Sequence, residues 1–236
     1  MFDSLLLSVD TVLLIVFPYI AIVMFLLVSI QRYRGRMFTY SSLSSQFLEN
    51  QHHFWALVPF HYGIIALTLG HLIGFLLPSQ VIAWNSAPLR LYVLEVSALV
   101  FGLLTFVGLI GLIVRRIRDP KLRIVTSRAD RIVLTILLLN VFSGLYVALF
   151  FGWGSSWFAS AATPYLWSLL TLSPDAASVS AMPFMVKAHI VMAWVLVAVF
   201  PFTRLVHVLV VPNHYLWRRP QVVRWYGIRR MLKGGA

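Results

Sequence analysis

Four of the seven histidines lie inside apolar stretches long enough to cross a lipid bilayer, and their spacing indicates cofactor chemistry. His61 and His71 fall on one predicted span, and His189 and His207 fall on another. Ionisable side chains are rare in membrane spans because removing them from water is costly, so each histidine is a functional candidate. Two histidines on each of two helices is the arrangement that axially ligates two stacked haems in a membrane bundle.

A structural role is the alternative for these histidines. A buried histidine can hydrogen-bond across helices or line a polar cavity, including a proton path. For a single intramembrane histidine this role is the better interpretation, whereas four on two spans favour haem ligation. The remaining histidines fall in a predicted loop and a basic tail, and we do not expect them to be ligands: His52, His53 and His214.

The composition indicates an all-α, polytopic membrane protein. Apolar residues make up 60% of the chain, against about 45–50% in an ordinary soluble domain. The 26 charged residues, 19 Lys or Arg and seven Asp or Glu, cluster between apolar blocks. A net charge of +12 would suggest nucleic-acid binding in a soluble protein, but in a membrane protein it follows from the positive-inside rule. We therefore expect a lipid bilayer, and no nucleic acid, as a partner.

The chain contains no cysteine. This excludes disulfides, protein-ligated iron–sulfur clusters and the thioether attachment of a c-type haem. Any haem is therefore held noncovalently, as b type, and electrons that leave it must pass to an iron–sulfur centre in a partner subunit. The first apolar segment has no basic stretch before it and is too long for a cleavable signal, so we expect it to remain as a span.

Five apolar blocks reach the roughly 20 residues that a helix needs to span a bilayer. We expect them at about 11–31, 54–78, 91–114, 132–153 and 184–211, followed by a basic tail at 212–236, in a single di-haem domain that covers 1–236. The long connection 154–183 is expected to include a short interfacial helix near Pro164–Leu172.

Basic residues alternate between the connections and predict the orientation. Seventeen Lys and Arg residues fall on one side of the predicted bundle, whereas the other side holds only Arg90 and Lys187. Because basic loops stay in the cytoplasm, we expect the N-terminus outside and the C-terminus in the cytoplasm.

This orientation pairs the histidines by depth. At 1.5 Å per residue, His61 lies about 10 Å and His207 about 6 Å from the cytoplasmic ends of their spans. His71 and His189 lie about 10 and 8 Å from the outer ends. We therefore expect His61 and His207 to share an inner haem, and His71 and His189 to share an outer one.

The angular fit of these pairs is weaker than the fit in depth. A straight helix places His189 and His207 on one face, because eighteen residues make five whole turns. The same geometry turns His61 and His71 roughly 80° apart. We expect helix tilt and a kink at Pro201 to absorb this mismatch.

Two features beside the histidines fit a flat macrocycle. Gly63, Gly70 and Gly74 would leave space for it, although glycines four residues apart are also common where helices pack closely. Arg204, three residues before His207, could pair with haem propionates, or it could act only as a cytoplasmic anchor.

The sequence resembles the cytochrome b (gamma) subunit of respiratory, membrane-bound nitrate reductase. The strongest segments of the resemblance are 60–65 (FHYGII) with 70–74 (GHLIG), and 200–207 (FPFTRLVH). Weaker ones are 17–20 (FPYI), 44–46 (SSQ) and 127–130 (SRAD). The resemblance covers most of the chain.

The resemblance implies a di-haem subunit in a prokaryotic cell membrane, with the family's ligands on His61, His71, His189 and His207. It further implies that quinol is oxidised near the outer haem and that electrons pass through both haems to a cytoplasmic iron–sulfur subunit and a molybdenum subunit that reduces nitrate. The family places a lysine of its quinol site at the outer start of the third span. Arg90 stands at this position, which keeps the cation but changes its geometry.

The residues themselves also point to Arg90 as part of a quinol site. It is one of only two basic residues on the outer side, although an arginine at this depth can simply snorkel to the interface. Glu95, five residues deeper, could accept a quinol proton or act as a structural partner of Arg90. Lys187 is the alternative cation.

Two rival functions remain open from the sequence. Related membrane cytochromes serve heterodisulfide-reductase-like and sulfite-reduction-associated complexes, so the terminal acceptor rests on the family resemblance. A haem-free membrane anchor, or a transporter that moves protons on histidines, is the rival from another class.

Overall fold

A computed structural model describes residues 9–36, 39 and 53–210, and the regular structure within these residues is entirely helical. The predicted basic tail at 212–236, His52 and His214 lie outside them. The elements are η1 (Val12–Val16), α2 (Phe17–Arg36), α3 (His53–Leu76), α4 (Pro78–Asn85), α5 (Pro88–Arg118), α6 (Pro120–Val125), α7 (Arg128–Phe150), α8 (Gly154–Trp157), η3 (Phe158–Ala162), α9 (Thr163–Leu170), α10 (Ala177–Ser180), α11 (Phe184–Val199), η4 (Phe200–Phe202) and η5 (Arg204–Val210).

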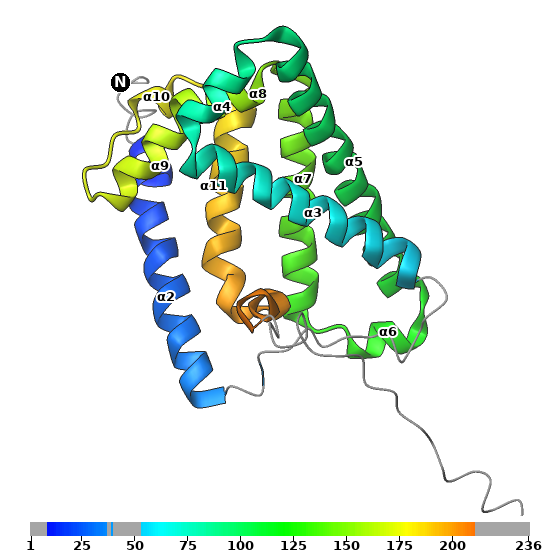
Figure 1. Cartoon of the computed structure of the whole chain (residues 1–236). Helices are drawn as coiled ribbons and strands as arrows, with labels where there is room; N and C mark the ends of the chain where they lie inside the picture. Colours follow the sequence, from blue (N-terminus) through cyan, green and yellow to red (C-terminus); the bar gives the residue numbers. More distant parts are fainter. Residues whose placement is uncertain (1–8, 37–38, 40–52, 211–236) are drawn as a thin grey trace, which may run out of the picture.

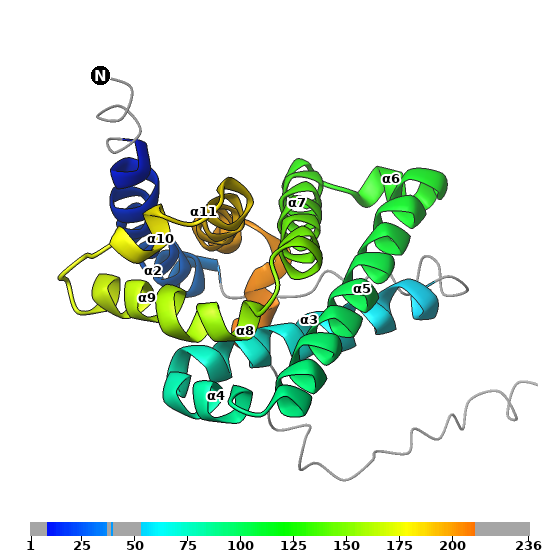
Figure 2. The same ribbon diagram turned by 90° about the horizontal axis from the view of Figure 1, so that it is seen from above.

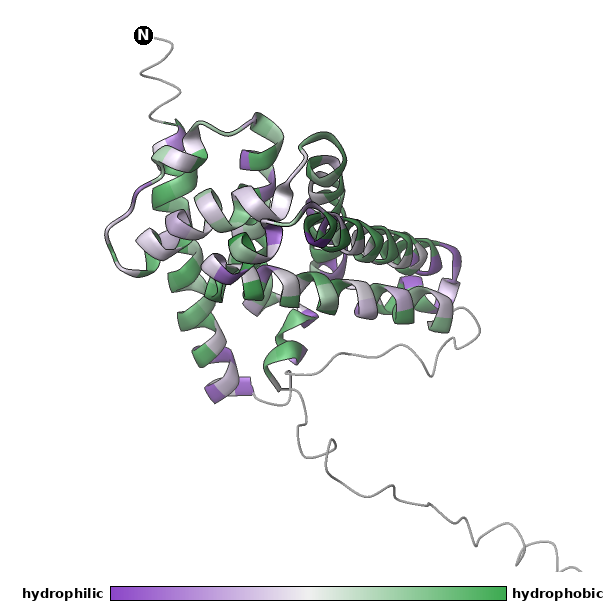
Figure 3. Ribbon diagram, turned by 45° about the horizontal axis from the view of Figure 1, so that its top comes forward, coloured by the Kyte–Doolittle hydropathy of each residue, from purple (hydrophilic) through white to green (hydrophobic). Residues whose placement is uncertain are grey.

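The five predicted spans are confirmed as helices that are long and apolar enough to cross a membrane. They cover Val9–Arg36, Phe54–Leu76, Pro88–Arg118, Arg128–Phe150 and Phe184–Phe202. Hydrophobic colours prevail along the long helices in Figure 3, and strongly hydrophilic residues gather near several of their ends. A short helix is also present near Pro164–Leu172, as α9 (Thr163–Leu170), and its place at the membrane interface stays a prediction.

The spans form a bundle in which one helix is strongly inclined. Helices α2, α11, α7 and α5 lie side by side in that order, whereas α3 crosses the bundle obliquely and packs along α5 (Figures 1 and 2). Within the described residues, α3 packs closely with α4, α5, α9 and η3, but not with α11 or α7. The two segments that carry the four candidate histidines, α3 and α11 with η5, are therefore not in close contact with each other.

Glycines explain the close approach of α3 and α5. A Cβ at Gly63 would overlap Thr105, and a Cβ at Gly108 would overlap the backbone of Phe60. Gly63 therefore serves helix packing, which corrects the expectation that it makes space for a macrocycle. In contrast, a Cβ added at Gly70 would meet no atom within 4 Å.

Proline residues leave carbonyls that the short helices satisfy. Pro78 has no N–H to donate to the carbonyl of Gly74 four residues earlier, so α3 ends there. The Thr163 hydroxyl donates to that carbonyl (3.1 Å), and the Trp167 indole N–H donates to the next one, of Phe75 (3.1 Å). Helix α9 is thereby bound to the end of α3.

The same device joins α9 to the first span. Pro18 cannot donate to the carbonyl of Leu14, and the Tyr165 hydroxyl donates to it instead (2.7 Å). Burial raises the pKa of Tyr165 to about 12, which keeps this donor protonated. Because α9 bonds to both α2 and α3, it closes one end of the bundle.

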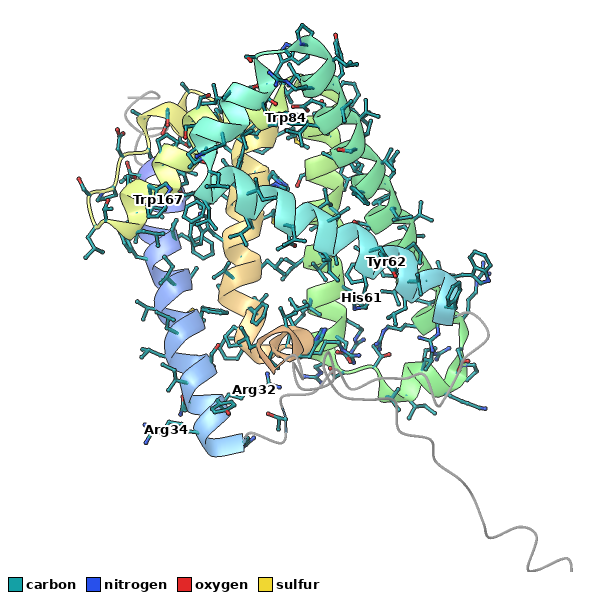
Figure 4. All side chains as sticks on the ribbon, viewed as in Figure 1. Arg32, Arg34, His61, Tyr62, Trp84 and Trp167 are labelled. Atoms are coloured by element: carbon teal, nitrogen blue, oxygen red, sulfur yellow. The ribbon has the colours of Figure 1, made fainter. Side chains whose placement is uncertain are left out.

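The basic ends of the helices gather at the other end, which we name the basic end; it carries the last turns of α2 and α5 and the start of α7. Figure 4 places Arg32 and Arg34 there and Trp84 toward the opposite end, which we name the outer end after the orientation expected from the sequence. The predicted alternation of basic and nonbasic connections is thus confirmed within the described residues.

The last span is shorter than predicted. The expected range 184–211 assumed one straight helix, but α11 ends at Val199 and is followed by two short 3₁₀ segments, η4 and η5. Pro201 cannot continue the hydrogen-bond ladder, and Thr203 is extended, with ψ near −179°. Arg32 of α2 donates to the carbonyls of Pro201 (2.6 Å) and Thr203 (3.0 Å), which stabilises the break.

Candidate cofactor site

The four candidate histidines share one hydrogen-bond pattern. In each, ring atom Nδ1 lies within hydrogen-bond distance of a backbone carbonyl oxygen: His61 with Leu57 (2.9 Å), His71 with Leu67 (2.8 Å), His189 with Asn140 (3.1 Å) and His207 with Arg204 (2.6 Å). A carbonyl oxygen only accepts, so Nδ1 must carry the proton. The lone pair is then on Nε2, which is the form that ligates a metal while the opposite nitrogen is held by an acceptor.

His71 and His189, the two histidines expected to share the outer haem, are named the outer pair here; they lie on α3 and α11. The ring of His71 meets the ring of Phe158 edge-on, with centroids 5.3 Å apart. The ring of His189 lies against α7 at Gly144, where a Cβ atom would come within 2.9 Å of the Cε1 atom of the ring.

His61 and His207 belong to segments that converge at the basic end. Phe60 meets the ring of His61 edge-on (centroids 5.2 Å apart) and packs on a cluster of buried residues, Leu109, Val133 and Leu137. Leu205 of η5, two residues before His207, packs on the same cluster. The break after α11 therefore turns the His207 segment toward α7, and the argument from a straight helix that placed His189 and His207 on one face is wrong.

These residues fit haem better than a free metal ion. No group of three or more His, Cys, Asp or Glu side chains that could hold an ion occurs among the described residues. A haem brings four nitrogen ligands of its own, so two imidazoles complete its iron. The separation of α3 from α11 and the open space at Gly70 fit a flat group between these segments. The space beside Gly74 is instead occupied by Phe158, whose ring would lie 2.9 Å from a Cβ atom at this position.

Arg204 forms an ion pair in the protein itself. Its Nε donates to the Oδ1 atom of Asp130 (2.6 Å), and Arg116 lies 3.9 Å from the other carboxylate oxygen. Asp130 is only 4% exposed and caps the start of α7 with Ser127. Asp130 was not among the functional residues expected from the sequence, although an acidic residue at the end of a span and three residues after a serine is a recognisable signal.

Arg90 and Glu95 bind different elements near the outer end. Arg90 donates to the Ser86 hydroxyl (3.2 Å) and lies over the Trp84 ring, 5.5 Å from its centroid. Glu95 accepts from both the N–H (2.8 Å) and the hydroxyl (2.6 Å) of Ser155. The alternative in which Glu95 is a structural partner of Arg90 is therefore wrong, since five residues on a helix place the two side chains about 140° apart.

Lys187, the alternative cation, is bound at the N-terminal end of the first span. Its Nζ donates to the Asp10 carboxylate (2.8 Å) and to the carbonyl of Ser180 (3.3 Å). Beyond Arg90 along α5, in contrast, one side of the helix bears an open apolar surface formed by Tyr92, Val93, Val96, Ser97, Val100 and Phe101.

Five helices that are long and apolar enough to cross a membrane, with three histidines inside them and a fourth just after the last one, are typical of a membrane cytochrome b. The family described as nitrate reductase gamma subunit matches residues 10–226. The chain is 32% identical to the nitrate reductase gamma chain of Bacillus subtilis (strain 168), over 89% of this chain and 95% of that protein. It is also 32% identical to the respiratory nitrate reductase 2 gamma chain of Escherichia coli (strain K12), over 89% and 94% of the two chains. The chain belongs to the nitrate reductase gamma subunit family.

Family membership makes the chain a membrane-bound electron-transport component of an oxidoreductase. It agrees with the resemblance found in the sequence and favours a nitrate reductase over the heterodisulfide-reductase-like and sulfite-reduction-associated assemblies. The haem-free anchor or transporter is disfavoured, because the gamma subunit is a haem-containing cytochrome b.

Proposed function

We propose that this chain is the di-haem subunit of a respiratory nitrate reductase, which oxidises quinol near the outer face and delivers electrons to an iron–sulfur and molybdenum module on the cytoplasmic face. The observation that carries the proposal is the shared state of the four histidines, each with Nδ1 on a carbonyl and Nε2 available. Family membership supports it independently.

Two haem b groups would be held by His71 with His189 and by His61 with His207. When bound, haem supplies reversible one-electron transfer, which matches a two-electron quinol to one-electron iron–sulfur centres. The residues of the chain set the rest: the carbonyls orient each imidazole, the apolar helices exclude water, and Arg204 at the inner site is a candidate to pair with a propionate.

Quinol would bind between Arg90 and the outer pair. The Arg90 guanidinium can donate a hydrogen bond to a quinol oxygen and stabilise the charge that develops as protons leave. The open apolar surface of α5 could contact a hydrophobic tail. Glu95 is the candidate acceptor for a quinol proton, and Ser155 holds its carboxylate in place. Lys187 is less suited to this site because Asp10 already pairs with it.

The basic end would face the cytoplasm, with the N-terminus outside. The positive-inside rule supports this orientation, because seventeen of the nineteen Lys and Arg residues belong to that side in the sequence. The iron–sulfur and molybdenum subunits would then dock at the basic end, close to His61 and His207. Relatives named as respiratory nitrate reductase gamma chains support this choice of partners.

The test is a visible spectrum and haem assay of the purified chain, followed by reduction with a quinol analogue. We expect a b-type spectrum with two haems per chain that acid–acetone releases, because no cysteine tethers them. A ratio near one haem per chain, or no haem, would exclude the proposed ligand set. Two haems that quinol cannot reduce would exclude the proposed reaction.

A further inference from the structure

We propose that α7, which bears no candidate ligand, positions both ligand histidines of the C-terminal segment. Ser143 of α7 orients His189 directly, and Asp130 of α7 orients His207 through Arg204. This inference rests on the proposed function, since it takes these histidines as haem ligands. It assigns positioning roles to two residues at opposite depths of one helix.

His189 is held differently from the other three histidines. His61, His71 and His207 place Nδ1 on a carbonyl three or four residues earlier in the same segment. The Nδ1 atom of His189 instead contacts another helix, α7, where it lies 3.1 Å from the Asn140 carbonyl oxygen and 3.0 Å from the Ser143 hydroxyl oxygen. The imidazole orientation at the outer site therefore depends on α7.

The Ser143 hydroxyl is arranged to accept from the imidazole. Its own proton is directed to the Asn140 carbonyl at 2.9 Å, which leaves a lone pair for the Nδ1–H of His189. Ser143 is only 5% exposed, so no water competes freely for this contact. A second acceptor on Nδ1–H fixes the ring plane and makes the imidazole a stronger donor to iron.

At the inner site the connection runs through the backbone. The Nδ1–H of His207 donates to the carbonyl of Arg204, whose side chain donates to Asp130. Asp130 is in turn fixed by the backbone N–H of Ser127 (3.0 Å) at the start of α7. Because the chain is extended at Thr203, α11 does not continue into η5, and the ion pair with Asp130 is one constraint on the first residue of η5.

The experiment compares Ser143→Ala and Asp130→Asn in the full chain. For each haem one measures the content, the midpoint potential by redox titration and the low-spin ferric EPR signal, which reports imidazole orientation. We expect Ser143→Ala to keep both haems, raise the potential of the outer haem and shift only its EPR signal. We expect Asp130→Asn to change only the inner haem, by a shift of its EPR signal or by loss of that haem.

Each variant is the control for the other, and Ser168→Ala is the matched control for loss of a serine. The Ser168 hydroxyl donates to the carbonyl of Tyr165 three residues earlier (2.7 Å), as Ser143 donates to Asn140, but Ser168 lies on α9 and has no hydrogen bond to a histidine among the described residues. Ser168→Ala should leave both haems unchanged. Wild-type EPR signals and potentials for both haems in Ser143→Ala and Asp130→Asn, or equal shifts of both haems in either variant, would overturn the inference.

Two further outcomes are also decisive. If Asp130→Asn does not insert into the membrane, Asp130→Glu replaces it; the longer carboxylate moves Arg204, so a shift confined to the inner haem supports the inference and wild-type signals overturn it. A failure of the proposed function is distinguishable, because it shows in the unmodified chain as a haem content other than two.

Discussion

Ser155 donates two hydrogen bonds to the carboxylate of Glu95, one from its backbone N–H at 2.8 Å and one from its hydroxyl at 2.6 Å. These bonds join α5 to the short helix α8 at the outer end. Phe158 follows α8 directly and meets the ring of His71, so Glu95 belongs to the surroundings of the outer histidine. The carboxylate of Glu95 thus has a structural role, which is to bind Ser155. Its proposed role as acceptor of a quinol proton can be tested separately.

Glu95→Gln should separate the two tasks. The amide oxygen can still accept from Ser155, so we expect both haems and the fold to persist, whereas the side chain can no longer take up a proton. A general base contributes about 10²–10⁴ to a rate, so quinol oxidation should fall by roughly a hundred-fold or more. The measurement is stopped-flow haem reduction by a quinol analogue. Ser155→Ala keeps the carboxylate and is the control; a Glu95→Gln rate equal to wild type would leave Glu95 with the structural task alone.

Arg90→Ala should lower quinol oxidation and leave haem content unchanged. Loss of one hydrogen bond from a charged donor costs roughly 1.5–3 kcal/mol, which corresponds to a fall of about ten- to a hundred-fold. Arg90→Lys should recover part of the rate, because an ammonium group supplies the charge without the planar fork. Lys187→Ala provides the comparison: it breaks the Asp10 pair and should lower stability without changing the rate per haem. The opposite ranking would move the quinol site to Lys187.

The pairing of the histidines can be tested one ligand at a time. His71→Ala and His189→Ala should each remove the same haem, and His61→Ala and His207→Ala should each remove the other. The reason is that each haem iron would have one imidazole ligand on each face, and loss of either imidazole leaves the iron without one of its two protein ligands. Low-temperature spectra of the four variants give the assignment. A shared spectral change in the His61 and His189 variants would contradict both the depth argument and the proposed pairs.

Tyr165→Phe should destabilise the closed outer end. It leaves the buried carbonyl of Leu14 without its donor, which costs about 1–3 kcal/mol and should lower the melting temperature in detergent. Tyr19→Phe is a milder comparison, since its bond to the Leu169 carbonyl is longer, at 3.1 Å.

The same tyrosine predicts a pH dependence. An unfolded tyrosine ionises near pH 10, whereas burial raises the pKa of Tyr165 to about 12. The unfolded chain therefore loses its proton first, and the contribution of Tyr165 to stability is present below about pH 10 and declines between about pH 10 and 12. Melting temperatures across this range should fall less steeply in Tyr165→Phe. An unchanged slope would show that Tyr165 ionises equally in both states.

Local properties of the sequence were enough to predict the five spans and to select four histidines as candidate ligands. Apolar length determines whether a helix can cross a bilayer, and an imidazole inside such a stretch is conspicuous because its burial is costly. The existence of α9 and the placement of the basic residues at one end also followed from local composition. These features need no knowledge of which helices are neighbours.

Contacts between distant segments decided the rest. The sequence marks Pro201 as a break, but the extended residue after it is stabilised by Arg32, which comes from the first span. Gly63 could leave space for a cofactor or allow close helix packing, and the position of Thr105 on α5 decided for packing. Arg90 and Glu95 are near in sequence yet bind different elements, because the turn of one helix points them apart. Polar side chains in an apolar bundle take the partner that folding brings within hydrogen-bond distance, and sequence separation carries no information about that partner.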